Sequence, residues 1–176
     1  MVGTNWAWVT RCRSTAASSS SGSKRSMITA VAPMAIAPLR WTQEAIAMGA
    51  TAVIMERFEP ELLLAAVEEH RVTHAQFVPT MFVRLLKLPD EVKARYDVSS
   101  LRGALHAAAP CPPDVKRAMI DWWGPVINEF YGSTESSAVT LASSADTLKK
   151  PGPVGRVVEG AEVRTIEGLG GEHPLQ

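Results

Sequence analysis

The chain has 176 residues, 46% of them hydrophobic and 20% charged, which is the composition of one ordinary globular domain with a sizeable core. The formal net charge is zero, so the composition gives no general attraction to nucleic acid. No apolar run reaches the ~18–20 residues that a membrane-spanning helix needs. Cys12 and Cys111 are too far apart for a metal or redox motif, which indicates free thiols and a reducing, cytoplasmic location.

The N-terminal segment differs in charge from the rest. No Asp or Glu precedes Glu44, whereas five basic residues do: Arg11, Arg13, Lys24, Arg25 and Arg40. From Glu44 onwards the chain has 13 basic and 18 acidic residues. Residues 1–26 contain the run of Ser and Gly at 18–23, which is typical of flexible chain. An Arg- and Ser-rich, acid-free segment also resembles a transit peptide. We favour a disordered or misread N-terminal segment.

From residue 51 onwards, short apolar runs alternate with helical patterns. The expected strands are Thr51–Met55, Val72–Val78, Leu101–Ala107 and Val126–Tyr131, and the expected helices are Glu61–His70, Thr80–Leu88 and Asp114–Trp123. This alternation predicts an α/β fold with a parallel sheet, covering helices and right-handed crossovers. We expect Leu62, Ala65, Ala66 and Val67 to face the sheet. After Leu141 we expect a turn-rich linker, then strands at Val154–Val158 and Ala161–Ile166.

Two loops that follow expected strands contain candidate functional residues. In the first, Tyr131 offers a flat face for a purine, Gly132 allows close approach of the backbone, and Ser133-Thr134-Glu135 adds two hydroxyls and a carboxylate. In the second, the small residues Ala107–Pro110 would let a base come close. Ligands of parallel sheets gather beyond the carboxyl ends of the strands. The alternatives are a polar turn for the first loop and a strand end with small core residues for the second.

The first loop, preceded by Asn128-Glu129-Phe130, resembles the adenine- and Mg-binding motif of the adenylate-forming (AMP-binding) superfamily, and most closely that of the fatty-acyl-CoA ligases. Further matches follow in the same order along the chain: 49–55, Arg71–His74, Val78–Met81, Ser99–Arg102, Ala107–Pro110 and 152–155. The resemblance implies that residues 27–166 are a partial AMP-binding domain, part of the large N-terminal domain of such an enzyme. Residues 167–176 would be a truncated tail.

The resemblance also implies roles for individual residues. Tyr131 would stack on adenine, Thr134 would contact the α-phosphate, and Glu135 would be the metal ligand that places Mg²⁺. Thr134 and Glu135 are therefore the expected catalytic residues. The expected nucleotide-binding residues are Ala108, Ala109, Pro110, Asn128, Glu129, Phe130, Tyr131, Gly132, Ser133 and Thr134.

The implied reaction is activation of a fatty acid by ATP to an acyl-adenylate, followed by transfer of the acyl group to CoA. The family also uses a lysine in an upstream phosphate loop and, further downstream, an aspartate, an arginine and a lysine. None of these has a counterpart at a matching position in this sequence, so we expect a central fragment with little turnover of its own. The alternatives are a remnant that binds a nucleotide or a partner without chemistry, and a relative that acts on an amino or aryl acid. We expect His74 and His106 to be structural.

Overall fold

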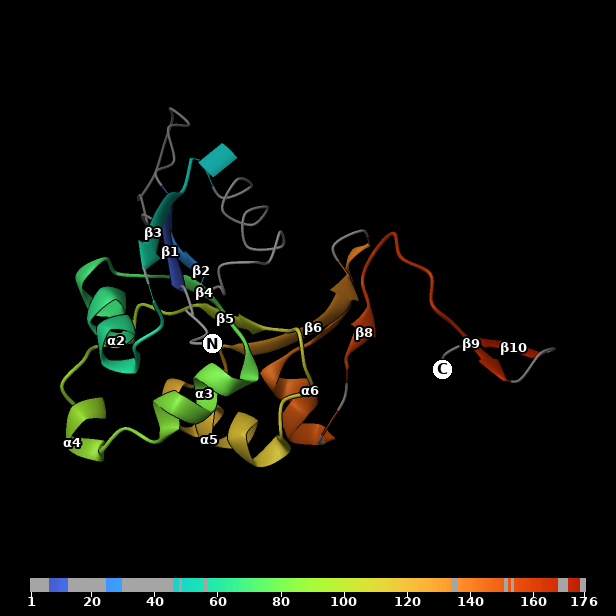
Figure 1. Ribbon diagram of the computed structural model, residues 1–176. Helices are drawn as coiled ribbons and strands as arrows, with labels where there is room; N and C mark the ends of the chain where they lie inside the picture. The colour runs from blue at the N-terminus through green and yellow to red at the C-terminus, as the bar shows by residue number, and fades with distance from the viewer. Residues whose placement is uncertain are drawn as a thin grey trace, which may run out of the picture.

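The computed structural model describes residues 7–12, 25–29, 46–47, 49–55, 57–133, 136–150, 152, 154–167 and 171–174. In these parts the chain forms an eight-stranded sheet with helices packed on it and a separate two-stranded hairpin (Figure 1). The strands are β1 (Ala7–Cys12), β2 (Arg25–Thr29), β3 (Thr51–Met55), β4 (His74–Phe77), β5 (Gly103–His106), β6 (Ile127–Ser133), β7 (Ser137–Ala142), β8 (Arg156–Val157), β9 (Arg164–Glu167) and β10 (Gly171–Pro174). The helices are α2 (Pro60–Glu69), α3 (Pro79–Leu86), α4 (Asp90–Lys93), α5 (Pro113–Trp123) and α6 (Ser144–Lys149).

The large sheet is mixed, with a parallel centre. Its strand order is β3-β1-β2-β4-β5-β6-β7-β8, in which β2, β4, β5 and β6 are parallel neighbours. On one side β1 runs antiparallel to β2 and β3, and on the other β7 runs antiparallel to β6 and β8. The expected α/β architecture is therefore present, and the antiparallel strands are what the sequence pattern did not predict. The turn from β6 to β7 is far shorter than the dozen or more residues that a parallel crossover requires.

The N-terminal residues also differ from the sequence prediction. We expected residues 1–26 to be disordered or misread, but β1 and the first residues of β2 come from this segment and pair with the sheet. Two strands therefore lie between β3 and β4, which are consecutive strands of the predicted strand–helix–strand pattern. The rest of residues 1–26 lies outside the described residues.

Helices α2, α3 and α5 cover one face of the parallel centre (Figure 1). Along β4, β5 and β6 the buried residues alternate with half-buried ones, because successive side chains of a strand point to opposite faces. The core under the helices includes Phe77, Phe82 and Trp123, whose rings lie 5.1–6.3 Å apart between centroids. Burying such side chains stabilises the fold by ~1.5–3 kcal/mol each.

The buried face of α2 differs from the predicted one. Leu63, Leu64 and Val67 are fully buried, whereas Leu62 is 53% exposed. Leu62 was therefore wrongly placed in the core, because the apolar stripe that faces the sheet is centred one residue further along. Each of α2, α3 and α5 has a proline at the start of its first turn, where the missing N–H has no intrahelical partner to lose.

Helix α6 was not predicted, although the sequence contains a signal for it. Ser143 and Asp146 form a capping box: the Ser143 hydroxyl accepts from the backbone N–H of Asp146, and the Asp146 carboxylate accepts from the backbone N–H of Ser143. Ser144 donates a hydrogen bond to the backbone oxygen of Ile127, at 2.6 Å, and so ties α6 to β6. Among the described residues no helix has the length and apolar character needed to cross a membrane.

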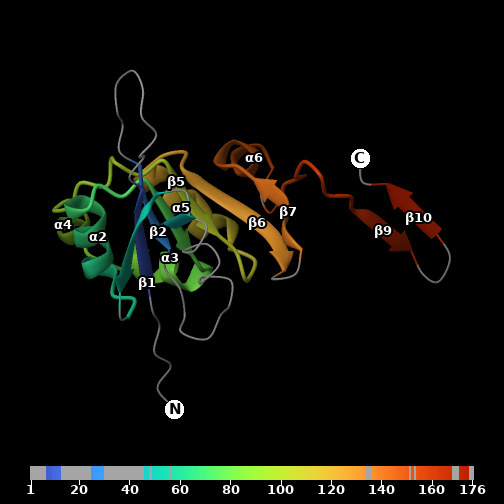
Figure 2. The ribbon, with the colours of Figure 1, turned by 90° about the horizontal axis from the view of Figure 1, so that it is seen from above.

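The β9–β10 hairpin stands apart from the rest. It pairs with no strand of the large sheet, and both ribbon views place it away from the helices (Figure 2). The residues that border the candidate site all precede it in the chain.

Candidate nucleotide-binding site

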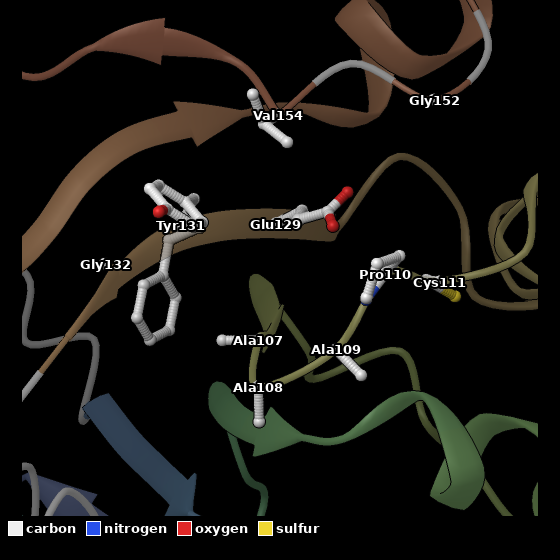
Figure 3. A pocket seen from close by; sticks show the side chains of 11 residues that line it. Ala107, Ala108, Ala109, Pro110, Cys111, Glu129, Tyr131, Gly132, Gly152 and Val154 are labelled. Carbon is white, nitrogen blue, oxygen red and sulfur yellow. The ribbon is translucent and has the colours of Figure 1, made fainter. Parts of the chain in front are cut away.

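A cavity of about 370 Å³ lies where β5 and β6 end. Its lining residues come from the loop after β5, from β6 and from the segment before β8: Ala107, Ala108, Ala109, Pro110, Cys111, Glu129, Phe130, Tyr131, Gly132, Gly152 and Val154 (Figure 3). The volume is within the range of small-molecule sites. The cavity lies beyond the carboxyl ends of two parallel strands, which is where α/β sheets bind their ligands.

The loop after β5 lines the cavity. Its side chains are small, and the backbone of Ala108 has a φ of 75°. This left-handed conformation is costly for a residue with a Cβ atom, at ~1–2 kcal/mol. Residues held in such conformations cluster at functional sites. The loop then continues through Cys111 and Pro112 into α5.

Tyr131 of β6 also lines the cavity. The side chain is 63% exposed even though it lies within β6. The pairing of β6 with β7 is irregular between Tyr131 and Gly132, and such an irregularity re-aims the side chains beside it. Figure 3 shows the ring of Tyr131 on the side of β6 that faces Val154, and Ala107 and Ala108 line the same cavity. An exposed aromatic ring in a cavity that is also lined by small residues offers a stacking face to a flat ring.

An ion pair connects the cavity wall to α5. Glu129 of β6 lines the cavity, and its Oε2 accepts a hydrogen bond from the Nζ of Lys116, which α5 buries to 2% exposure. His106 of β5 is fully buried beside them, with its Nε2 3.9 Å from the same oxygen. Burial, and then the Lys116 charge, lower the pKa of His106 to about 3, so the imidazole is neutral at physiological pH.

Cys111 is a poor nucleophile in this setting. Burial raises the pKa of its thiol to about 11, and the Lys116 charge offsets only part of that rise. Because the thiolate is the reactive form, we assign Cys111 no chemical role.

The outer wall is the segment that leads into β8. Thr140 of β7 donates a hydrogen bond to the backbone oxygen of Val154 at 2.5 Å. Gly155 packs so closely on the backbone of Leu141 that no Cβ atom fits there, and it has a φ of 97°. These two contacts fix the position of Gly152 and Val154 beside the cavity.

The structure brings together most of the expected nucleotide-binding residues. Seven of them line the cavity: Ala108, Ala109, Pro110, Glu129, Phe130, Tyr131 and Gly132. Asn128 does not line it, and its amide donates to the backbone oxygen of Val126 at 3.0 Å. Ser133 does not line it either, since its hydroxyl exchanges hydrogen bonds with Ser136 across the β6–β7 turn. Thr134 and Glu135 lie outside the described residues, so the catalytic and metal-ligand predictions remain predictions.

Lys116 is the residue that sequence reasoning missed. A lysine in a helix is usually a solvated charge, and nothing in the motifs included it. Its signal is the spacing: Lys116, Met119, Ile120 and Trp123 recur at three- and four-residue steps and are all buried. Lys116 therefore lies on the apolar face of α5. Lys149, Lys150 and Arg156, in contrast, are exposed.

The model of the AMP-binding enzyme family matches residues 4–174. The chain therefore belongs to the AMP-binding enzyme family. It is 38% identical over 125 residues to 4-coumarate–CoA ligase 1 of Oryza sativa subsp. japonica, an alignment that covers 68% of this chain and 22% of the rice protein. The chain spans less than a quarter of the length of that relative.

Solved structures have the same fold. A mutant of the amide bond synthetase McbA from Marinactinospora thermotolerans superposes with a TM-score of 0.74 at 29% identity, covering 81% of this chain and 29% of that one. The N-terminal domain of FACL13 from Mycobacterium tuberculosis has a TM-score of 0.63 at 24% identity, covering 72% and 32%, and at that identity it shows the fold alone. The prediction that this chain is part of the large N-terminal domain of an adenylate-forming enzyme is confirmed.

Proposed function

We propose that the cavity between the loop after β5 and Tyr131 binds the adenosine part of ATP and of an acyl-adenylate. The observation that carries this proposal is that Ala108, Ala109 and Pro110 border the same cavity as Tyr131, although at least twenty residues separate them from it in the chain. The exposed ring supplies a stacking face, and the small loop residues leave the space opposite it open. A purine is flat and fits between two such walls.

The whole reaction that we propose is ATP-dependent ligation of an acid to a thiol. The substrate carboxylate attacks the α-phosphorus of ATP, the bond to the β-phosphate breaks, and pyrophosphate leaves. The thiol of CoA then attacks the acyl carbon and AMP leaves with its bonding electron pair. Thr134 would donate a hydrogen bond to the α-phosphate and Glu135 would hold Mg²⁺, which neutralises the developing charge. Membership of the AMP-binding family and the similarity to a CoA ligase support this proposal.

We propose a fatty acid as the acid, on the resemblance of the motifs to fatty-acyl-CoA ligases. An aryl acid is the second candidate, because the relative with 38% identity is named a 4-coumarate–CoA ligase. Calorimetric titration of the chain with an alkanoate and with 4-coumarate, each in the presence of AMP, would separate the two candidates.

We expect the 176-residue chain to bind nucleotide without completing the reaction, since it spans under a third of the relatives' length. Exchange of labelled pyrophosphate into ATP tests this expectation, because it requires the adenylation step. No exchange together with saturable AMP binding is the expected result. Robust exchange, or thioester formation with CoA, would contradict it.

Substitution of Tyr131 tests the adenosine site itself. Tyr131→Ala removes the stacking face and should weaken AMP binding by ~1–3 kcal/mol, which is roughly 5- to 150-fold in Kd. Tyr131→Phe keeps the ring and should bind nearly as well as the wild type. Calorimetric titration of the three proteins measures this difference. Equal affinities would remove Tyr131 from the site.

A further inference from the structure

Helix α5 directs a lysine to Glu129, which lines the cavity. Lys116 lies among Met119, Ile120 and Trp123 on the buried face of the helix and is 2% exposed. Its Nζ donates to Glu129 Oε2. Among the described residues, the contacts of the Glu129 carboxylate with Lys116 and His106 both fall on Oε2, and none falls on Oε1.

Fold stability alone is a weak explanation for this pair. Two charges taken out of water lose several kcal/mol each in solvation, and well-packed apolar residues of similar size are often as stabilising or more so. A pair that served only the fold could lie away from any cavity. Glu129, in contrast, is paired with Lys116 and also forms part of the cavity wall.

Within the described residues, Lys116 is the one cation that compensates the negative charge of Glu129. The groups that face it are Lys116 from α5, His106 from β5 and Cys111 from the loop after β5. The pKa of His106 is lowered to about 3 and that of Cys111 is raised to about 11, so neither ionises near neutral pH. Asp114, in the first turn of α5, is an exposed carboxylate that also acts on Cys111.

We propose that Lys116 is a positioning residue for purine recognition: it compensates the buried charge of Glu129 and holds its Oε2, so that Oε1 accepts a hydrogen bond from the amino group of the bound base. This inference rests on the proposed adenosine site. An ionised carboxylate can only accept hydrogen bonds. It therefore favours adenine, whose 6-amino group donates, over hypoxanthine, whose 6-oxo group is an acceptor at the same place.

The test uses adenosine and inosine as probes, because nucleosides have no phosphate that titrates near neutral pH. Their affinities are measured from about pH 5.5 to 7.5. The wild-type chain should prefer adenosine and show a flat pH profile. Lys116→Met leaves the carboxylate buried without its cation, which disfavours the charged form of the carboxylate. Its adenosine affinity should fall about tenfold, the loss of one charge-assisted hydrogen bond, and should recover as the pH rises.

Two further variants separate recognition from packing. Lys116→Arg keeps the cation and should keep the flat profile and the preference for adenosine. The double variant K116M/E129Q has a neutral pair of similar size, so it should fold, show a flat profile and lose the preference for adenosine. Circular dichroism melts check that each variant is folded.

The outcomes distinguish this inference from the proposed function. If the wild type binds neither nucleoside nor AMP, the proposed adenosine site is wrong and this inference fails with it. If the wild type binds adenosine and folded Lys116→Met does so equally well with a flat profile, only the role of Lys116 is wrong. If Lys116→Met does not fold, the double variant decides: a retained preference for adenosine overturns the inference, and its loss supports it. A pH dependence that persists in the double variant would belong to another group and would also overturn it.

Discussion

Ala108 holds the loop after β5 in a backbone conformation that glycine adopts at lower cost. Its φ of 75° should cost ~1–2 kcal/mol, whereas glycine loses ~0.5–1 kcal/mol through the greater freedom of the unfolded chain. We therefore predict that Ala108→Gly raises the free energy of unfolding by ~0.5–1 kcal/mol. Denaturant titration measures it.

The neighbouring Ala109 is the matched control for that change. Its φ is not positive, so Ala109→Gly gains nothing in the folded state and should destabilise the protein by ~0.5–1 kcal/mol. If both glycine variants are destabilised alike, the left-handed conformation at Ala108 does not carry the strain assigned to it.

His106 should make the fold sensitive to mild acid. In the unfolded chain the imidazole takes up a proton near pH 6.5, but burial beside Lys116 lowers its pKa in the fold to about 3. Between these values the unfolded state binds more protons, so stability falls as the pH drops below 6.5, by up to ~1.4 kcal/mol per pH unit for one proton. Unfolding free energies of the wild type and His106→Gln, measured across this range, should diverge in that way. Parallel curves for the two proteins would contradict the assigned pKa.

At the scale of elements, the contact between β7 and the segment before β8 shapes the cavity. A Cβ atom on Gly155 would overlap the backbone carbonyl of Leu141. Gly155→Ala must therefore move this segment, and with it Gly152 and Val154, away from β7. We predict a loss of ~1–3 kcal/mol in unfolding free energy, as for overpacking, together with weaker AMP binding.

Gly160 provides the control for Gly155. It also has a positive φ, of 85°, but nothing lies within 4 Å of the site of its Cβ atom. Gly160→Ala should cost only the ~1–2 kcal/mol of left-handed backbone and leave AMP affinity unchanged. Weaker AMP binding in this variant, or unchanged AMP binding in Gly155→Ala, would contradict the assigned role of Gly155.

The elements that could be predicted are those whose signals are local. β3 has the predicted bounds, and the helices α2, α3 and α5 begin at prolines within one residue of their predicted starts. β1 could not be predicted, because whether residues 7–12 form a strand depends on pairing with β2 and β3 rather than on their own pattern. The same holds for β7, which pairs with β6 across a short turn. Sheet order is a non-local property, and the alternation of strands and helices does not specify it.

At the scale of the whole molecule, the candidate site combines parts that sequence reasoning could and could not supply. The two motif loops were predicted to meet because both follow parallel strands, and the structure places them around the same cavity. Lys116 was not predicted, because a buried lysine is rare and its partner Glu129 lies 13 positions away. Gly152 and Val154 reach the cavity only through the position of β8 beside β7.

The central claim is that the adenosine part of a nucleotide lies between the loop after β5 and Tyr131. Titration of the isotope-labelled chain with AMP, followed through backbone amide chemical shifts, tests it most directly, with CMP as the control for a smaller base. We predict saturable shifts confined to residues 107–111, 129–132 and 152–154, and smaller ones with CMP. Shifts confined to α2 and α4, or equal responses to the two nucleotides, would contradict the claim.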